Sequence, residues 1–139
     1  MARLLAAIAT TAALVLHASA AAAAERPIHQ LRIYEIFEGN KAAFHARFRD
    51  HAQRIMARHG FRILSMWETT AEDRTEFVYL LEWPDEATMK AAWTRFMADP
   101  EWAEIKRVTG ARHGPLVGGI EDRTLRLTDY AHPPGAARH

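Results

Sequence analysis

The first group of side chains able to do chemistry lies on a predicted strand. Residues 28–37 alternate with period two and include β-branched and aromatic side chains, which is typical of a strand. The alternation puts three polar side chains on one side: Gln30, Arg32 and Tyr34. If Leu31 and Ile33 face the helices, these three face the other, enclosed side of the sheet. A guanidinium enclosed there is costly unless a carboxylate or a ligand pairs with it.

Two interpretations of this polar trio stay open. The simpler one is a structural ion pair of Arg32 with Glu82, Glu68 or a second subunit. In the other, Arg32 and Tyr34 orient an anionic or carbonyl-bearing ligand. The apolar wall of such a ligand site would come from three aromatic residues: Trp67, Tyr79 and Trp83. The sequence assigns no catalytic residue.

The chain's 8 histidines suggest a metal site, but their spacing does not support one. His51 and His59 lie roughly 12 Å apart along a helix axis, too far to share an ion, and His45 points to another face than His51. His29 and His113 converge only if the tertiary fold brings them together. We therefore predict no metal site, and expect His51 and His59 to be partly buried with a hydrogen-bond partner. A haem would need His59 or His113 as its axial ligand, and nothing marks either residue.

Other classes of chemistry lack their residues. The chain has no cysteine, which excludes thiol catalysis, thiolate metal sites and iron–sulfur clusters. Ser65, the one serine after residue 24, has no flanking glycines of a nucleophile elbow, and no glycine-rich phosphate loop follows a strand. Acidic and basic side chains balance after residue 24, which argues against nucleic-acid binding. We predict no cofactor.

The elements that position these residues follow one another as strand, helix, strand, strand, helix, strand. The strands are expected at residues 28–37, 61–69, 75–83 and 120–128, and the helices at 41–59 and 85–98. A short helix should open at Asp99, and a loop rich in glycine and proline should follow it from Gly110. The sequence predicts a five-residue hairpin loop over 70–74, an N-cap at Asn40, and packing roles for Trp93 and Trp102. This order is that of an α+β, ferredoxin-like sheet of four antiparallel strands with both helices on one face.

The strands also carry apolar side chains at both odd and even positions, and so on both faces of the sheet: Tyr79 and Leu81 point to one face, Val78 and Leu80 to the other. Two helices cover only one face of a sheet, so a second copy of the chain is the expected cover of the other. We therefore expect a homodimer in which two sheets face one another, a dimeric α+β barrel.

The N-terminus has the three parts of a secretory signal peptide. Arg3 is followed by the apolar run Leu4 to Leu16 and by small residues up to Ala20 or Ala24, where cleavage is expected. The run is shorter than the roughly 20 residues of a membrane span. We expect a periplasmic or secreted protein without a membrane anchor after cleavage, with a signal peptide at 1–24, one domain at 25–130 and a disordered tail at 131–139.

Several short motifs, in order, resemble one known family. They are Leu31-Arg32-Ile33-Tyr34 with Gly39, His59-Gly60 leading to Trp67, Val78-Tyr79-Leu80-Leu81-Glu82-Trp83, and Asp99-Pro100-Glu101-Trp102. From about Ile28 to Thr128, the chain is similar to the NIPSNAP family. The resemblance implies a dimeric α+β barrel, an architecture shared by oxygenases, haem proteins, isomerases and members without known chemistry, so it does not imply an activity.

The function expected from the sequence is binding. An exported homodimer would hold a small apolar or aromatic ligand in its barrel pocket, without assured catalysis. The alternative is a cofactor-independent monooxygenase or isomerase, in which a tyrosine or histidine assists proton removal from a small organic substrate.

Overall fold

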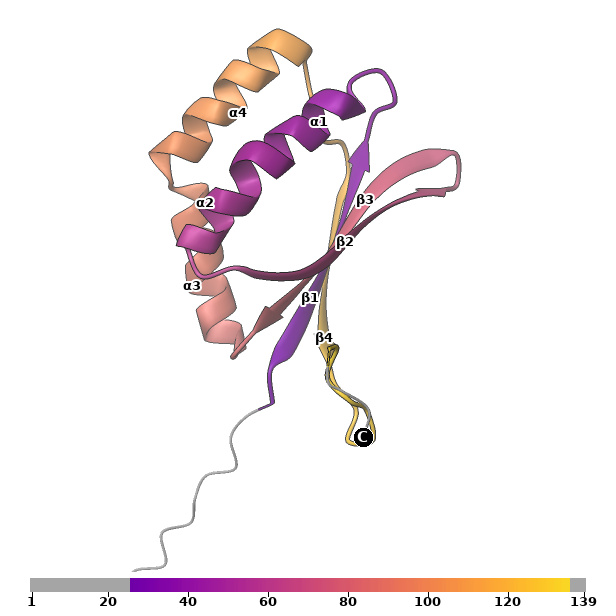
Figure 1. Cartoon of the computed structure of the whole chain (residues 1–139), viewed down its shortest axis with the longest axis vertical. Coiled ribbons are helices and arrows are strands. Elements are labelled where there is room, and N and C mark those ends of the chain that lie inside the picture. Colours follow the sequence, from indigo (N-terminus) through magenta and orange to yellow (C-terminus); the bar gives the residue numbers. More distant parts are fainter. Residues whose placement is uncertain (1–25, 136–139) are drawn as a thin grey trace, which may run out of the picture.

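The computed structural model describes residues 26–135, which form one four-stranded sheet and a layer of helices (Figure 1). The strands β1 (Ile28–Ile36), β2 (Arg62–Ala71), β3 (Arg74–Trp83) and β4 (Ile120–Arg126) pair antiparallel in the order β2-β3-β1-β4. The helices lie on one side of this sheet (Figure 1). The predicted α+β, ferredoxin-like fold is confirmed. The predicted signal peptide lies outside the described residues, as do residues 136–139 of the predicted tail.

The first helical segment follows the predicted range but is not uniform. It consists of α1 (Lys41–Arg47), the π-helical turn η1 (Phe48–Ala52) and α2 (Gln53–Arg58). Gly60, at φ 87°, ends the segment with the left-handed conformation that glycine adopts at little cost. The wide turn brings Phe48 and Ala52, both buried, towards the sheet. Such π-turns within helices often occur at functional sites.

The hairpin between β2 and β3 is tighter than the sequence indicated. Both strands run on through the predicted five-residue loop, so that Ala71 pairs with Arg74 and only Glu72 and Asp73 form the turn. These two residues take positive φ angles of 51° and 62°, as a two-residue hairpin turn requires. The prediction failed because neither residue is a glycine or asparagine.

The short helix expected after Asp99 is longer than predicted. α3 (Glu86–Met97) lies within the predicted range 85–98 and is capped by Asp85, and α4 (Pro100–His113) begins after the predicted cap Asp99. However, α4 continues through Gly110 to His113, where a loop was expected. Asn40 precedes α1 but makes no side-chain cap; instead its Nδ2 donates to the carbonyls of His113 and Pro115 and fixes the end of α4.

The helix-facing side of the sheet forms the core. Phe77, Tyr79, Leu81 and Trp83 of β3 point into it and are almost fully buried. Gln30 and Tyr34 of β1 pair with residues of this same row, so they also face the helices. The predicted orientation of β1 is therefore wrong: the polar trio faces the helices, and Leu31 and Ile33 face the uncovered side.

The uncovered side of the sheet carries an apolar surface within the described chain. Trp67, Val78 and Ile33 lie in one row across three strands, and Leu80 and Leu31 lie in the next. Trp67 is 49% exposed. We refer to these five residues as the open face.

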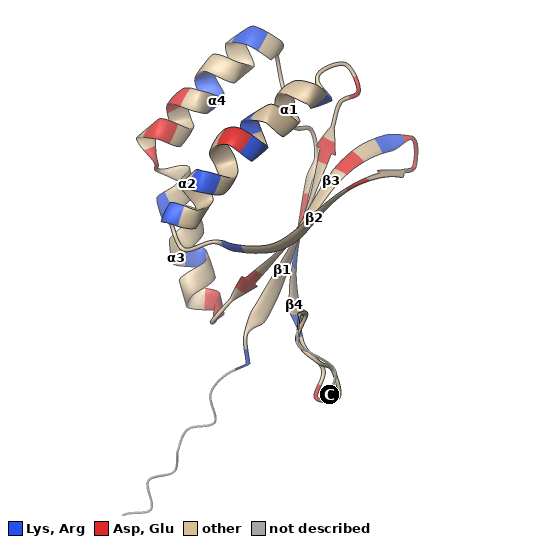
Figure 2. Cartoon of the chain, in the orientation of Figure 1, with Lys and Arg blue, Asp and Glu red and all other residues tan. Residues whose placement is uncertain are grey.

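The remaining surface is mixed in charge. Lysine, arginine, aspartate and glutamate all occur along the outer helices, with no long stretch of one sign (Figure 2). Within residues 26–135, no helix is both long and apolar enough to cross a membrane.

Candidate functional site

A cavity of about 390 Å³ lies between the helices and the sheet. Its apolar lining comes from every helical segment: Phe44, Phe48, Met56, Trp93, Phe96 and Trp102. Met97 and Ile120, which also line it, are more than half exposed, so the cavity opens to solvent at that rim. A partly enclosed volume of this size with a mainly aromatic lining is typical of a small-molecule site.

The sheet contributes two polar side chains to the cavity, Arg32 and Tyr34. The Tyr34 hydroxyl oxygen lies 2.6 Å from that of Tyr79, and Arg32 Nη2 donates a longer bond to Tyr34 at 3.4 Å. Burial, together with the neighbouring Tyr34, raises the pKa of Tyr79 well above its ordinary value. Tyr79 therefore keeps its proton and can donate it to Tyr34. Either hydroxyl can be the donor in this contact; when Tyr79 donates, the Tyr34 hydroxyl proton is free for a ligand.

Arg32 has an ion-pair partner that the sequence did not suggest. Its Nη1 lies 2.9 Å from Oδ2 of Asp122 on β4. The predicted partners are engaged elsewhere: Glu82 pairs with Arg62, and Glu68 pairs with Lys41. The guanidinium of Arg32 also stacks over Trp93, at 4.4 Å from the ring centroid. Its Nε atom is buried and has no partner within the described residues.

Gln30, the third member of the predicted trio, is fully engaged by the protein. Its Oε1 accepts bonds from the indoles of Trp83 and Trp93, at 3.0 and 2.8 Å. Its Nε2 donates to both carboxylate oxygens of Asp122. Because every hydrogen-bonding atom of this amide is used, Gln30 holds β1, β3, β4 and α3 together and has no donor or acceptor to spare for a ligand.

Two further cations reach the cavity from the helices. Arg47 of α1 and Lys106 of α4 lie over the Trp102 ring, with 5.5 and 5.8 Å to its centroid. Arg47 Nη1 donates to the hydroxyl of Thr109. Burial lowers the pKa of Arg47, although a guanidinium keeps its charge at neutral pH. No ion pair of Arg47 or Lys106 with a carboxylate occurs in the part of the chain that the structure describes.

The three aromatic residues predicted as a ligand wall do not line the cavity together. Trp67 is on the open face, on the other side of the sheet. Trp83 is fully buried against Phe61, and Tyr79 reaches the cavity only through Tyr34. The wall is formed instead by Trp93 and Trp102, for which the sequence suggested packing roles, and by the phenylalanines of α1 and η1.

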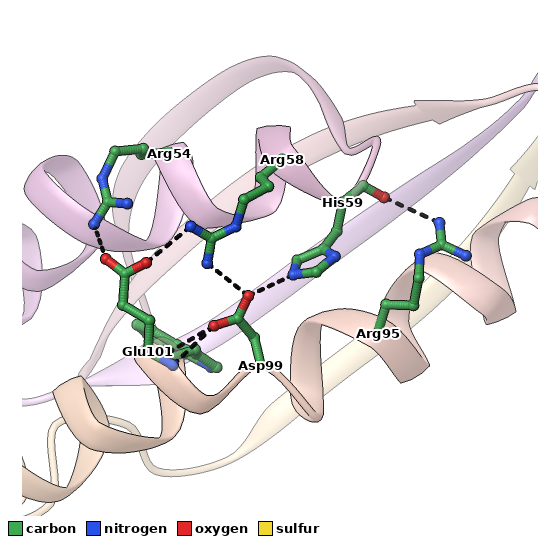
Figure 3. A network of polar contacts seen from close by, with 7 residues as sticks. Arg54, Arg58, His59, Arg95, Asp99 and Glu101 are labelled. Atoms are coloured by element: carbon green, nitrogen blue, oxygen red, sulfur yellow. Dashed lines mark hydrogen bonds and ion pairs between the residues drawn. The ribbon is translucent and has the colours of Figure 1, made fainter.

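His51 and His59 are both partly buried, as expected. The Nε2 of His59 lies 2.6 Å from Asp99 Oδ2, whereas no hydrogen bond of the His51 side chain occurs among the described residues. Arg58 and the backbone amides of Glu101 and Trp102 bind the same aspartate, which joins α2 to α4 (Figure 3). Within residues 26–135, no three histidine, aspartate or glutamate side chains lie close enough to hold a metal ion.

The comparisons with known proteins identify the family. The NIPSNAP family model matches residues 29–132, so the chain belongs to the NIPSNAP family. A NIPSNAP family protein from Agrobacterium tumefaciens has a similar structure, with a TM-score of 0.66 and 17% identity over 80% of this chain and 100% of that one. A NIPSNAP-like domain protein from Burkholderia xenovorans is also similar, with a TM-score of 0.65 and 20% identity over 77% of this chain and 90% of that one. No curated protein matches the chain.

Proposed function

We propose that this protein binds a small, mainly apolar or aromatic organic molecule in the cavity between its helices and its sheet. The observation that carries the proposal is the cavity of about 390 Å³ itself, lined mainly by large apolar side chains and open at one rim. Cavities in small domains are normally filled by side chains, since unfilled apolar volume is destabilising. A cavity kept open in a core this rich in aromatic residues is best explained by an occupant.

Binding can be tested with the neutral fluorescent probe N-phenyl-1-naphthylamine. Val117 lines the cavity from the loop after α4, so Val117→Trp should fill part of it and weaken probe binding at least about tenfold. Val108→Trp is the matched control, because Val108 is 46% exposed on α4 and does not line the cavity. Equal probe binding by both variants would overturn the proposal.

A second candidate function is proton transfer on a bound substrate, by a cofactor-independent monooxygenase or isomerase. The Tyr34 hydroxyl favours it, because it faces the cavity, shares a hydrogen bond with Tyr79 and accepts one from Arg32. A phenol held in this way can donate its proton to a carbonyl or enolate oxygen. For an enzyme, the double variant Arg32→Ala with Tyr34→Phe should abolish turnover of a candidate substrate in a protein that is still folded. Unchanged turnover would exclude this role.

We further propose that the protein works as an exported homodimer. The signal-like segment 1–24 supports export. Protein recovered from the periplasm or the medium should have the mass of a chain without residues 1–20 or 1–24. The open face supports the dimer, because apolar side chains in adjacent rows of a sheet are normally covered.

A further inference from the structure

The cations that line the cavity are not balanced by acids. Arg32, Arg47 and Lys106 all line it, whereas no aspartate or glutamate does. A partly enclosed site with one sign of charge and apolar walls concentrates the field of its charges. The lining therefore favours a ligand of negative charge over a neutral or positive one.

The three cations differ in how they are neutralised. Arg32 is paired with Asp122 and is stacked on Trp93, so most of its charge is met within the protein. Arg47 and Lys106 have only the hydroxyl of Thr109 and the face of Trp102 as partners among the described residues. By contrast, the more exposed Arg54, Arg58 and Arg62 all form ion pairs. Of the three cations that line the cavity, Arg47 and Lys106 are the two without a carboxylate partner within residues 26–135. Arg26, Arg95 and Arg112 also form no ion pair there, but they do not line this cavity.

Burial makes this arrangement costly for Arg47. Desolvation lowers its pKa, and no carboxylate in residues 26–135 offsets the loss of water. A charge that is partly removed from water and left without a counter-ion is destabilising, unless a ligand supplies that counter-ion.

The two cations also share one aromatic support. Phe96 stacks on the Trp102 indole with 5.1 Å between ring centroids, and Arg47 and Lys106 lie over the same indole. Trp102 thus joins the apolar wall of the cavity to its positive end. A ligand that meets both parts has an apolar body and an acidic group.

Resting on the function proposed above, we propose that the ligand is an organic anion, an apolar or aromatic acid whose deprotonated group binds between Arg47 and Lys106. Its body lies against the aromatic wall formed by Trp93, Phe96 and Trp102. A guanidinium and an ammonium on adjacent helices suit one carboxylate or sulfonate, since each of its oxygens can accept a charge-assisted hydrogen bond. The Tyr34 hydroxyl is available at the sheet end for a second polar group.

The experiment compares two probes with one aromatic frame. 8-Anilinonaphthalene-1-sulfonate carries a negative charge, and N-phenyl-1-naphthylamine lacks it. Arg47→Met and Lys106→Met remove each charge and keep an apolar stem. We expect each variant to weaken the binding of the anionic probe about tenfold, which is the effect of one charge-assisted hydrogen bond. The affinity for the neutral probe should change by less than about twofold.

The matched controls are Arg49→Met and Lys90→Met. Arg49 and Lys90 pair with Asp50 and Glu86 and do not line the cavity, so neither probe should bind differently. Val117→Trp should weaken both probes, which confirms that both occupy the cavity. If Arg47→Met does not fold, Lys106→Met, on the surface of α4, decides the question alone.

The outcomes separate this inference from the proposed function. If neither probe binds the wild-type protein, or Val117→Trp leaves both bound, the cavity is not their site and the proposed function fails with the inference. If the neutral probe binds in the cavity and the two charge variants leave the anionic probe unchanged, only the anion site is overturned. If the two charge variants weaken the binding of both probes equally, Arg47 and Lys106 have a purely structural role on Trp102. That result would also overturn the anion site.

Discussion

The hydroxyl oxygens of Tyr34 and Tyr79 lie 2.6 Å apart at the junction of the sheet and the cavity. Tyr79 is fully buried on β3, whereas Tyr34 lines the cavity from the neighbouring central strand β1. This contact joins a phenol that is buried and keeps its proton to a hydroxyl that a ligand can reach. The buried tyrosine orients the accessible one.

The first prediction concerns this pair. Tyr79→Phe keeps the ring and its contacts with Phe48 and Phe77, and removes only the hydroxyl that Tyr34 uses. We expect a loss of about 1–2 kcal/mol in the free energy of unfolding, as for other buried hydrogen bonds. Urea unfolding at neutral pH measures it.

Tyr130→Phe is the control for this variant, because Tyr130 is 84% exposed and should contribute almost nothing. An equal, negligible effect of the two substitutions would mean that the contact between Tyr34 and Tyr79 does not stabilise the fold.

The fold could be largely predicted from the sequence, since it depends on local patterns. Strand patterns located all four strands, and Asp99 was recognisable as a helix cap. The errors occurred where local signals are weak. Glu72 and Asp73 adopt positive φ angles without a glycine, and α4 passes through Gly110 because its last turn is held by Asn40 and not by its own composition.

The site was predictable only in part, because it depends on which side of the sheet the helices cover. Arg32 and Tyr34 were recognised as members of one polar row, and both line the cavity. The row was assigned to the wrong face, since β1 carries apolar residues at both parities and periodicity alone cannot choose between them. The partner of Arg32 is 90 residues away on β4, where no local pattern indicates it.

The helical part of the cavity was missed for a related reason. Phe44, Phe48, Trp93 and Phe96 have the spacing of an ordinary core-facing stripe, and nothing in that spacing shows that they enclose a space. The sequence also did not mark Arg47 of α1 and Lys106 of α4, because their lack of a carboxylate partner among the described residues is visible only in the structure.

The second prediction concerns the open face. Val78 lies at its centre on β3, paired with Trp67 on one side and Ile33 on the other. If a second copy covers this face, Val78→Glu would bury an unpaired carboxylate and weaken the dimer at least about 100-fold. Sedimentation velocity at micromolar concentration should show a dimer for the wild-type protein and a monomer for the variant.

Val108→Glu is the matched control on the outer surface of α4, where Val108 is exposed, and it should stay dimeric. A wild-type protein that sediments as a monomer would refute both the homodimer and the barrel.

The third prediction concerns Asp99 and acid stability. The His59 ring and the Arg58 guanidinium hold the pKa of Asp99 well below its ordinary 3.8. Because the pKa of Asp99 is lower in the folded protein, the unfolded chain takes up a proton at a higher pH than the folded one. The charged Asp99 therefore contributes its full stabilisation above its ordinary pKa. This stabilisation is lost as the pH falls towards the pKa of the folded state. Asp99→Asn should therefore be less stable than the wild-type protein at pH 7, and the difference should shrink below about pH 4.

Urea midpoints at pH 7, 5 and 3 measure this effect. Arg54 and Arg58 lower the pKa of the neighbouring Glu101 to about 2. Because Glu101 is present in the wild-type protein and in the Asp99→Asn variant, it affects the acid stability of both. Asp85→Asn is the control cap: Asp85 accepts the Thr88 amide and has no basic partner in the described chain, so its substitution should cost less at pH 7. A difference for Asp99→Asn that persists unchanged at pH 3 would show that its charge does not stabilise the junction of α2 and α4.

The fourth prediction concerns the two glycines before β4. A Cβ at Gly118 would lie 2.6 Å from Glu35 Oε2 and 3.0 Å from the Phe37 ring, whereas one at Gly119 would meet its nearest atom at 3.5 Å. Glu35 Oε2 accepts the Gly119 amide, so moving this carboxylate to admit a methyl group would break that bond. Gly118→Ala should therefore lower the free energy of unfolding by about 1 kcal/mol more than Gly119→Ala. Thermal unfolding of the two variants gives the comparison, and a smaller loss for Gly118→Ala than for Gly119→Ala would mean that the carboxylate moves without cost.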